Sequence, residues 1–269
     1  MIRAVLTATL ALGLSTGAAA PHKPRRIVSL NACSDQYLLA LADPGQIAAL
    51  SINARDPELS AAAARARAFP TLRRGAEEVL AIRPDLLLGF PAGPGRVAGA
   101  PPGRWRTLGI GNAESYGAVL DQIRQVARAV GHPARGEALI AQMNRDLAAL
   151  PRVRRGGVAA YYQRRGYLTG TGTLIDDMLR RVGLTNLAAR LGKPALAQVS
   201  LEEMVAARPD WLIVESATDR VQDQGTEMLH HRALAAIPRI SVPQAWTVCG
   251  GPAYVLAARH IVAQVNAAR

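Results

Sequence analysis

AEEVLAIRPDLLL at residues 76–88 and LEEMVAARPDWLI at residues 201–213 are two copies of nearly the same sequence. Seven of the thirteen positions are identical, and each matched pair of residues lies 125 positions apart. A single recurrence at that distance is too long for a solenoid repeat. It predicts two similar lobes, each with the same helix, turn and strand at the same place.

Both copies carry the local signals of a short helix followed by a buried strand. Ser200 is a good N-cap, and Glu203 stands three residues later to complete a capping box; Gly75 holds the equivalent cap position in the first copy. The proline of each RPD triplet disfavours helical geometry just before it, so each helix should end near the arginine. Capping occupies the second glutamate of each pair, which leaves Glu77 and Glu202 free to face outward.

Short apolar runs alternate with helical patterns along the rest of the chain. Strands are expected at 26–30, 47–51, 85–90, 105–110, 158–162, 211–213 and 239–242. Helices are expected from Ser34 or Asp35 to 42, and at 56–66, 115–130, 133–150, 174–182 and from 252 onward. This alternation indicates an α/β fold of two Rossmann-like lobes with parallel sheets, joined by a long helix. We assign residues 21–130 to the N-terminal lobe, 131–151 to the connecting helix and 152–269 to the C-terminal lobe.

The first twenty residues have the pattern of a secretory signal peptide. Arg3 precedes an apolar stretch at 4–14, and small residues follow at 17–20. We expect cleavage near Ala19 or Ala20 and a periplasmic mature protein. The net charge of +12 favours an anionic ligand or surface. The chain has no basic helix and no motif of stacking aromatic residues, so nucleic acid is not an expected partner.

Four segments together resemble one protein family. They are the opening RIVSLNACSDQYLLALADPGQIAAL at 26–50, the paired EE and RPD segments, the helix near 133–150 and the late segment AWTVCGGP at 245–252. The mature chain is similar over nearly its whole length to the periplasmic substrate-binding proteins of ABC importers for cobalamin, ferric siderophores and haem. The resemblance implies a monomer, without a cofactor and without enzyme activity, that delivers a small ligand to an importer permease dimer.

Within that family, the cobalamin-binding members are the nearest likeness, because they have a tryptophan-containing loop before the final helix. Trp246 falls in that loop. The cobalamin pattern also has a tyrosine in the loop after the second strand, whereas this chain has Asn53 in that region. Because of the tryptophan we expect a corrinoid as the ligand. Because of the missing tyrosine, a ferric siderophore or haem is the alternative.

Open parallel sheets bind ligands beyond the carboxyl ends of their strands. We expect the ligand cleft between the lobes, lined by the loops that follow the strands. The candidate ligand contacts in those loops are Asn31, Ser34, Asn53, Arg55, Arg164, Tyr167, Trp246 and Thr247. The same loops and strand ends also offer Ala32, Cys33, Ala54, Phe90, Pro91, Gln163, Arg165, Glu215 and Ser216. Only 4% of the residues are aromatic, so Tyr167 and Trp246 carry weight, although ordinary loop packing would also explain them. Arg164 and Arg165 suit an oxyanion such as a propionate or a catecholate, or they lie in a solvated turn.

Cys33 and Cys249 are the two cysteines of the chain. An even number of cysteines in an exported protein normally oxidises. The resemblance implies that both face the cleft, one from each lobe, where a disulfide would tie the lobes together. The alternatives are two free thiols near helix N-termini or soft ligands to a metal.

Glu77 and Glu202 match the positions at which this family places one acidic residue on each lobe. The resemblance implies that these residues meet arginines on the two permease subunits. Their equal placement in twin lobes suits a symmetric membrane dimer. The alternative is that acids in the first turn of a helix only complement its dipole.

Two other classes of function remain open. The five histidines show neither H-E-x-x-H nor another metal-ligand spacing, so we assign no catalytic and no metal-binding residue. A periplasmic enzyme would be recognised by turnover without any transporter. An adaptor protein that has lost its ligand would fit the missing tyrosine, and it would bind no corrinoid, siderophore or haem.

Overall fold

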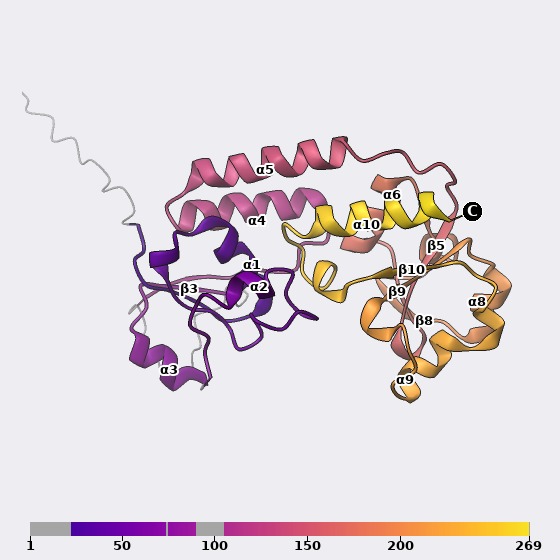
Figure 1. Ribbon diagram of the computed structural model, residues 1–269, viewed down its shortest axis with the longest axis horizontal. Coiled ribbons are helices and arrows are strands. Elements are labelled where there is room, and N and C mark those ends of the chain that lie inside the picture. Colours follow the sequence, from indigo (N-terminus) through magenta and orange to yellow (C-terminus); the bar gives the residue numbers. More distant parts are fainter. Residues whose placement is uncertain (1–22, 74, 90–104, 269) are drawn as a thin grey trace, which may run out of the picture.

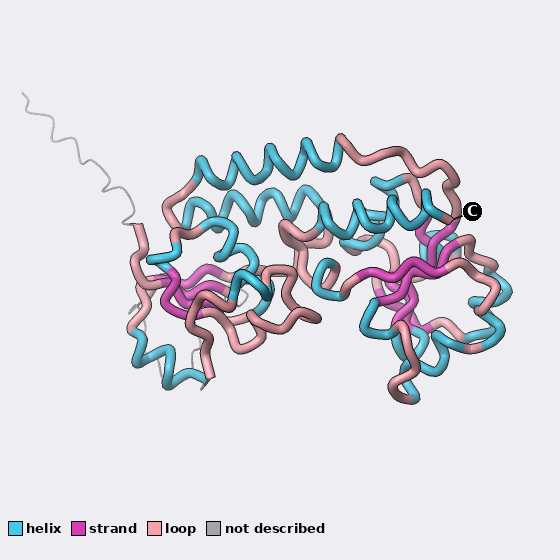
Figure 2. Tube along the Cα trace, in the orientation of Figure 1, coloured by secondary structure: helices cyan, strands magenta, loops and turns pink. Residues whose placement is uncertain are grey.

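The computed structural model describes residues 23–73, 75–89 and 105–268. The expected signal peptide and the whole segment 91–103 lie outside the described residues. Figure 1 shows two groups of strands at opposite ends of an elongated molecule, with the long helices α4 (Tyr116–Ala129) and α5 (Pro133–Ala148) along one side. Figure 2 shows the same two separate groups of strands. The chain therefore forms two α/β lobes, as the repeat predicts.

The N-terminal sheet has four parallel strands in the order β2-β1-β3-β4. They are β1 (Ile27–Ser29), β2 (Ile47–Ala49), β3 (Leu86–Leu88) and β4 (Arg106–Leu108). Its helices are α1 (Ala32–Leu41), α2 (Ala63–Ala66) and α3 (Gly75–Ile82). The helix expected at 56–66 is thus wrong over most of its length: the chain makes a series of turns there, and only the last residues are helical.

The C-terminal sheet repeats this order in its parallel part. The strands β7 (Thr185–Asn186), β5 (Val158–Gln163), β9 (Trp211–Glu215) and β10 (Arg239–Val242) correspond to β2, β1, β3 and β4. Two further strands are antiparallel: β6 (Tyr167–Thr169) pairs with β5, and β8 (Leu196–Gln198) pairs with β6. The expected parallel sheet is therefore present in this lobe, and an antiparallel pair of strands that the sequence did not predict extends it.

A tight turn produces the unexpected hairpin. Between β5 and β6 the chain makes a 3-10 turn at Arg164–Gly166, in which Arg165 and Gly166 both have positive φ, 58° and 76°. Glycine adopts that region without steric cost, and so the chain can reverse over three residues. Tyr167, expected in a loop, consequently lies on a strand.

The remaining helices of the C-terminal lobe are α6 (Leu174–Val182), α7 (Leu187–Arg190), α8 (Leu201–Ala207), α9 (Gln224–Glu227) and α10 (Tyr254–Ala267). Short 3-10 helices also occur at Pro44–Gln46, Ser216–Thr218, Met228–His230, Arg232–Leu234 and Gln244–Trp246. The bounds of α6 agree with those expected, because Thr173 caps its start and Gly183, with φ 89°, ends it.

The two copies of the repeat have the same structure. Helices α3 and α8 each stop before the arginine of RPD, and Arg83 and Arg208 both adopt left-handed geometry, with φ 52° and 47°. Asp85 accepts a hydrogen bond from the Arg26 amide at 3.0 Å, and Asp210 accepts one from the Val158 amide at 2.8 Å. Each aspartate thus holds the start of the central strand of its own sheet.

The helix starts differ from expectation in detail. The Ser200 hydroxyl caps α8 by accepting from the Glu203 amide at 3.1 Å. The Glu203 carboxylate, expected to complete the capping box, lies 2.7 Å from the Lys193 ammonium group. In the first copy, Gly75 is the first helical residue of α3 and not its cap.

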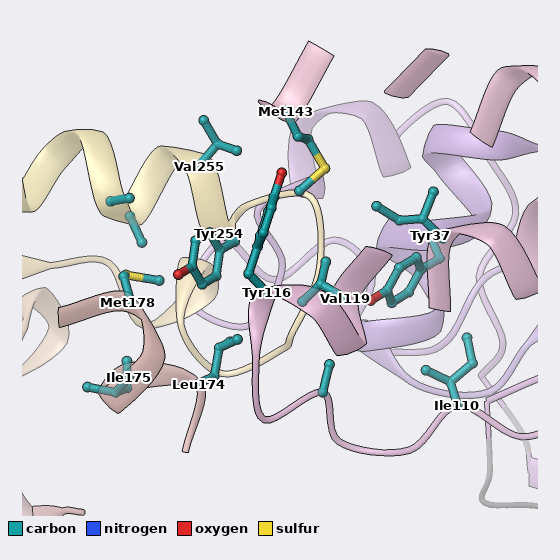
Figure 3. Packing of buried hydrophobic residues seen from close by; sticks show 14 of the residues in the cluster. Tyr37, Ile110, Tyr116, Val119, Met143, Leu174, Ile175, Met178, Tyr254 and Val255 are labelled. Atoms are coloured by element: carbon teal, nitrogen blue, oxygen red, sulfur yellow. The ribbon is translucent and has the colours of Figure 1, made fainter. Parts of the chain in front are cut away.

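One hydrophobic cluster extends through both lobes and joins them. At its centre are Tyr116 and Tyr254, the first residues of α4 and α10, whose ring centroids are 5.0 Å apart (Figure 3). The Asp177 carboxylate accepts from the Tyr254 hydroxyl at 2.7 Å and from the Tyr116 amide at 3.1 Å. The Arg181 guanidinium lies 4.7 Å from the centre of the Tyr116 ring. The junction of the lobes is therefore packed like a protein interior.

Candidate functional site

The loop after β1 is held by side chains that the sequence suggested would meet a ligand. Asn31 is the N-cap of α1: its Oδ1 accepts from the Ser34 amide at 2.9 Å and from the Ser34 hydroxyl at 2.7 Å. Its Nδ2 donates to the carbonyl of Gly89, which follows β3. The helix thus starts before Ser34 and Asp35, which were the expected caps. Asn31 and the fully buried Ser34 are engaged in internal hydrogen bonds.

Asp35 ties the same loop to the end of β2. Its carboxylate accepts from the amide of Ser51 at 2.9 Å and from the Ser51 hydroxyl at 2.5 Å. Burial raises the pKa of Asp35, while the hydrogen bonds from Ser29 and Ser51 oppose that shift. The loops after β1, β2 and β3 therefore form one cross-linked unit.

The Cys33–Cys249 disulfide joins this unit to the other lobe, which confirms the predicted pairing. The two Cα atoms are 5.3 Å apart. Next to the bond, the Tyr37 hydroxyl donates to the Gly250 carbonyl and lies 2.8 Å from Oε1 of Gln122. The loops at the carboxyl ends of β1 and β10 are thus in direct contact across the lobe boundary.

A polar cluster occupies the carboxyl ends of β5, β9 and β10. Oε1 of Glu215 accepts from Nε2 of Gln163 at 3.3 Å and from the Tyr161 hydroxyl at 3.5 Å. The Tyr161 hydroxyl also lies 3.0 Å from Oγ1 of Thr247. Burial raises the pKa of Glu215 and that of Tyr161. Gln163 and Glu215 were both among the residues expected at the strand ends, and each is the polar residue that ends an apolar strand.

Trp246 lies directly beside this cluster in the 3-10 helix after β10. Its ring is half-buried and makes a perpendicular contact with His260 of α10, with centroids 5.3 Å apart. The next side chains are Thr247, already engaged with Tyr161, and Val248, which is 47% exposed. Trp246 is therefore packed in part against its own lobe and remains partly accessible.

Two of the three arginines among the strand-end candidates have partners within their own lobes. Arg55 donates from Nη2 to the Phe69 carbonyl at 2.6 Å. Arg164 forms an ion pair with Asp223. Arg165, in the same turn, has an exposed side chain.

The structure thus groups some of the predicted residues and separates others. Trp246 and Thr247 lie together at the carboxyl edge of the C-terminal sheet. Asn53 is exposed in the turn after β2, next to Ile52, an apolar side chain that is 68% exposed and that the sequence did not single out. Tyr167 is exposed on β6, where it pairs with Gln163. Within the described ranges, no group of three or more His, Cys, Asp or Glu side chains is placed to hold a metal ion.

Glu77 and Glu202, the expected docking residues, are both exposed. Figure 1 places their helices, α3 and α8, at opposite ends of the molecule. Hydrogen bonds from its own backbone amide and from the Ser200 side chain lower the pKa of Glu202. Its carboxylate therefore also interacts with the start of α8, which is the alternative that the sequence left open.

The fold defines a two-lobed α/β binding protein, and the comparison with known families agrees. The model of the Periplasmic binding protein family matches residues 27–239, and so the chain belongs to this family. Members of the family bind haem, siderophores or vitamin B12 and deliver them to ABC permeases. No curated protein matches the chain.

Several solved structures share the fold over most of the chain. The periplasmic heme-binding protein RhuT from Roseiflexus sp. RS-1, in its apo form, is 25% identical with a TM-score of 0.68, over 90% of this chain and 98% of that one. An Fe3+-hydroxamate transport protein from Saccharomonospora viridis is 22% identical with a TM-score of 0.64, over 90% and 93%. The vitamin B12 binding protein BtuF of Vibrio cholerae is 14% identical with a TM-score of 0.63, over 92% and 98%.

The described part of the chain has no helix long and apolar enough to cross a membrane.

Proposed function

We propose that this protein binds a corrinoid between its lobes and delivers it to the permease of an ABC importer. The observation that carries the proposal is the polar cluster of Gln163, Glu215 and Thr247 beside Trp246. Ligand sites combine an aromatic or apolar surface with a few placed polar groups. Trp246 supplies a flat surface for the macrocycle, and the cluster supplies donors and acceptors for its amide side chains.

The charges at this edge favour a ligand without several negative groups. Glu215 contributes a carboxyl group, and the ion pair with Asp223 offsets the charge of Arg164. Arg55 lies in the other lobe, where it donates to a backbone carbonyl and keeps its charge. An anionic chelate would approach Glu215 with less compensation than a neutral, amide-rich corrinoid would. The net charge of +12 acts over a longer range and does not decide the contacts within the site.

Haem or a ferric siderophore is the second candidate. Arg165 favours it, because its side chain is exposed at the turn after β5 and suits a propionate or a similar oxyanion. The likeness to the heme-binding RhuT and to the Fe3+-hydroxamate transport protein supports the same class. The two ligand classes can be distinguished by mutation, because a corrinoid should depend on Glu215 and an anionic chelate should depend on Arg165.

Titration of the purified mature protein with cyanocobalamin, haemin and ferrichrome tests the proposal. We expect tightest binding of cyanocobalamin, weakened by Glu215→Leu and little changed by Arg165→Gln. The reverse pattern, with haemin or ferrichrome bound best and binding lost in Arg165→Gln, would replace the corrinoid by an anionic chelate. A protein that binds none of the three would favour the adaptor class, and turnover of a ligand without a transporter would favour an enzyme.

We also propose that Glu77 and Glu202 dock the protein on the two permease subunits. Both are exposed and occupy the same position in the two copies of the repeat. The double variant Glu77→Arg with Glu202→Arg should bind ligand normally and should fail in transport into permease-containing vesicles. Glu58→Arg with Glu227→Arg, which reverses two other exposed acids, is the matched control. Normal transport by the docking variant would remove both residues from the interface.

The proposal includes export to the periplasm with cleavage near Ala19 or Ala20, and action as a monomer without a cofactor. The proposal also places the end of the N-terminal lobe at residue 130 and the start of the C-terminal lobe at residue 152, with the connecting helix at 131–151. The N-terminal sequence of the secreted protein and its mass in solution test export and the oligomeric state directly.

A further inference from the structure

A cavity of about 290 Å³ lies where the two lobes and the connecting helix meet. Its walls come from α1 and α2 of the first lobe, from α5, and from α10 of the second lobe. Figure 1 shows α10 reaching from the C-terminal lobe toward α1 beneath α5, and Figure 3 shows Met143 and Val255 of the wall close to Tyr116. The cavity is lined by helices on the long-helix side of the molecule, whereas the proposed corrinoid site is built from strand-end loops.

The wall of this cavity contains a buried polar group without a partner. Gln36 of α1 lines the cavity and is only 4% exposed. Among the described residues, its Nε2 has no hydrogen-bond acceptor. Buried side-chain donors in native proteins nearly always have a partner. The amide is covered by protein in this arrangement, so an acceptor from outside the chain reaches it only when the Gln36 side chain turns towards the cavity that it lines.

The charged side chains of the wall do not balance. Nη2 of Arg259 lies 3.8 Å from Oδ1 of Asp146, and so these two charges offset each other. Arg65 of α2 also lines the cavity, and no ion pair involving it occurs in the part of the chain that the structure describes. One positive charge is left for an anionic group.

The rest of the wall is largely apolar. Leu39 of α1, Leu139 of α5 and Val255 of α10 line it, and Leu256, which is 40% exposed, lies at the same wall. The volume is at the lower limit for small-molecule sites, which rules out a corrinoid or a haem on size. A short apolar chain with one anionic end would match both the volume and the wall.

We propose that this cavity is a second ligand site that takes a small amphipathic carboxylate. The carboxylate group pairs with Arg65, the Gln36 side chain turns so that its Nε2 donates to the carboxylate, and the alkyl chain lies against Leu39 and Leu256. Because its walls belong to both lobes, the occupied site holds one arrangement of the lobes. This inference does not rest on the identity of the main ligand.

Hexanoate is the probe, titrated into the mature, disulfide-intact protein by calorimetry and followed on the side-chain amide signals of the ¹⁵N-labelled protein. The Gln36→Leu variant identifies the Gln36 signal and replaces the orphaned amide by an apolar group of similar size. We expect saturable binding that shifts the Gln36 signal and that is about tenfold tighter than the binding of acetate or hexylamine.

Arg65→Gln should weaken hexanoate binding about tenfold, whereas Arg67→Gln, an exposed neighbour outside the cavity wall, should leave it unchanged. Three outcomes would overturn the proposal. They are the absence of saturable binding, equal binding of hexylamine, and equal binding by the wild type and the Arg65→Gln variant. The last outcome would place the bound hexanoate elsewhere on the protein.

Discussion

The disulfide between the lobes should contribute strongly to the stability of the whole chain. Cys33 and Cys249 are 216 positions apart, and so the bond closes almost the entire mature chain into one loop. The loop-entropy relation gives about 5 kcal/mol for a closure of this length, and measured contributions are commonly about 2 to 4 kcal/mol. We therefore expect Cys33→Ala with Cys249→Ala to lower the free energy of unfolding by about 2 to 5 kcal/mol.

Urea unfolding followed by circular dichroism measures this change. Because one hydrophobic cluster extends through both lobes, the wild type should unfold in a single transition. Wild-type protein that has been reduced and alkylated at both cysteines is the control, because it loses the cross-link without losing the side-chain sulfur atoms. Its midpoint should fall close to that of the double variant.

Two results would refute this reasoning. Two thiols that react in the denatured, unreduced wild-type protein would show that the bond is absent in the secreted chain. An unchanged midpoint in the double variant would show that the cross-link does not restrict the unfolded chain as the loop-entropy relation assumes.

Three further predictions follow from single side chains. Arg208→Gly should raise the free energy of unfolding by about 1 kcal/mol, because it relieves left-handed geometry; Arg67→Gly, at φ −61°, should lower it in the same urea assay. Burial raises the pKa of Glu215 above its ordinary value of 4.5, so its contribution to stability is lost as pH rises through the raised pKa. Over the same rise in pH, the thermal unfolding temperature of the Glu215→Gln variant should therefore fall less than that of the wild type. Trp246→Ala should weaken corrinoid binding by about 1 to 3 kcal/mol in the titration, and an unchanged affinity would remove Trp246 from the site.

Local signals in the sequence predicted much of the backbone. The twin RPD triplets predicted two helix ends and two strands, and Arg83 and Arg208 stop their helices as expected. Such positions depend on proline, glycine and capping residues, which act over a few neighbours. For the same reason, the bounds of α6 were correct.

The candidate site was harder to predict, because the partners of polar side chains are chosen over long distances in the chain. Asn31 bonds to the carbonyl of Gly89, and Arg164 pairs with Asp223. No local pattern reveals that either side chain is already engaged. The β6 and β8 strands were missed for a related reason, since neither is a buried apolar run and each is defined by its pairing.

The identity of the bound ligand tests the central claim most directly. The protein should be purified from its native periplasm without added ligand, and the absorption spectrum of the material that remains bound should be recorded. Our account predicts the visible bands of a corrinoid, released on denaturation in an amount close to that of the protein. A haem Soret band or the charge-transfer band of a ferric siderophore, retained through purification in equal amount, would contradict it.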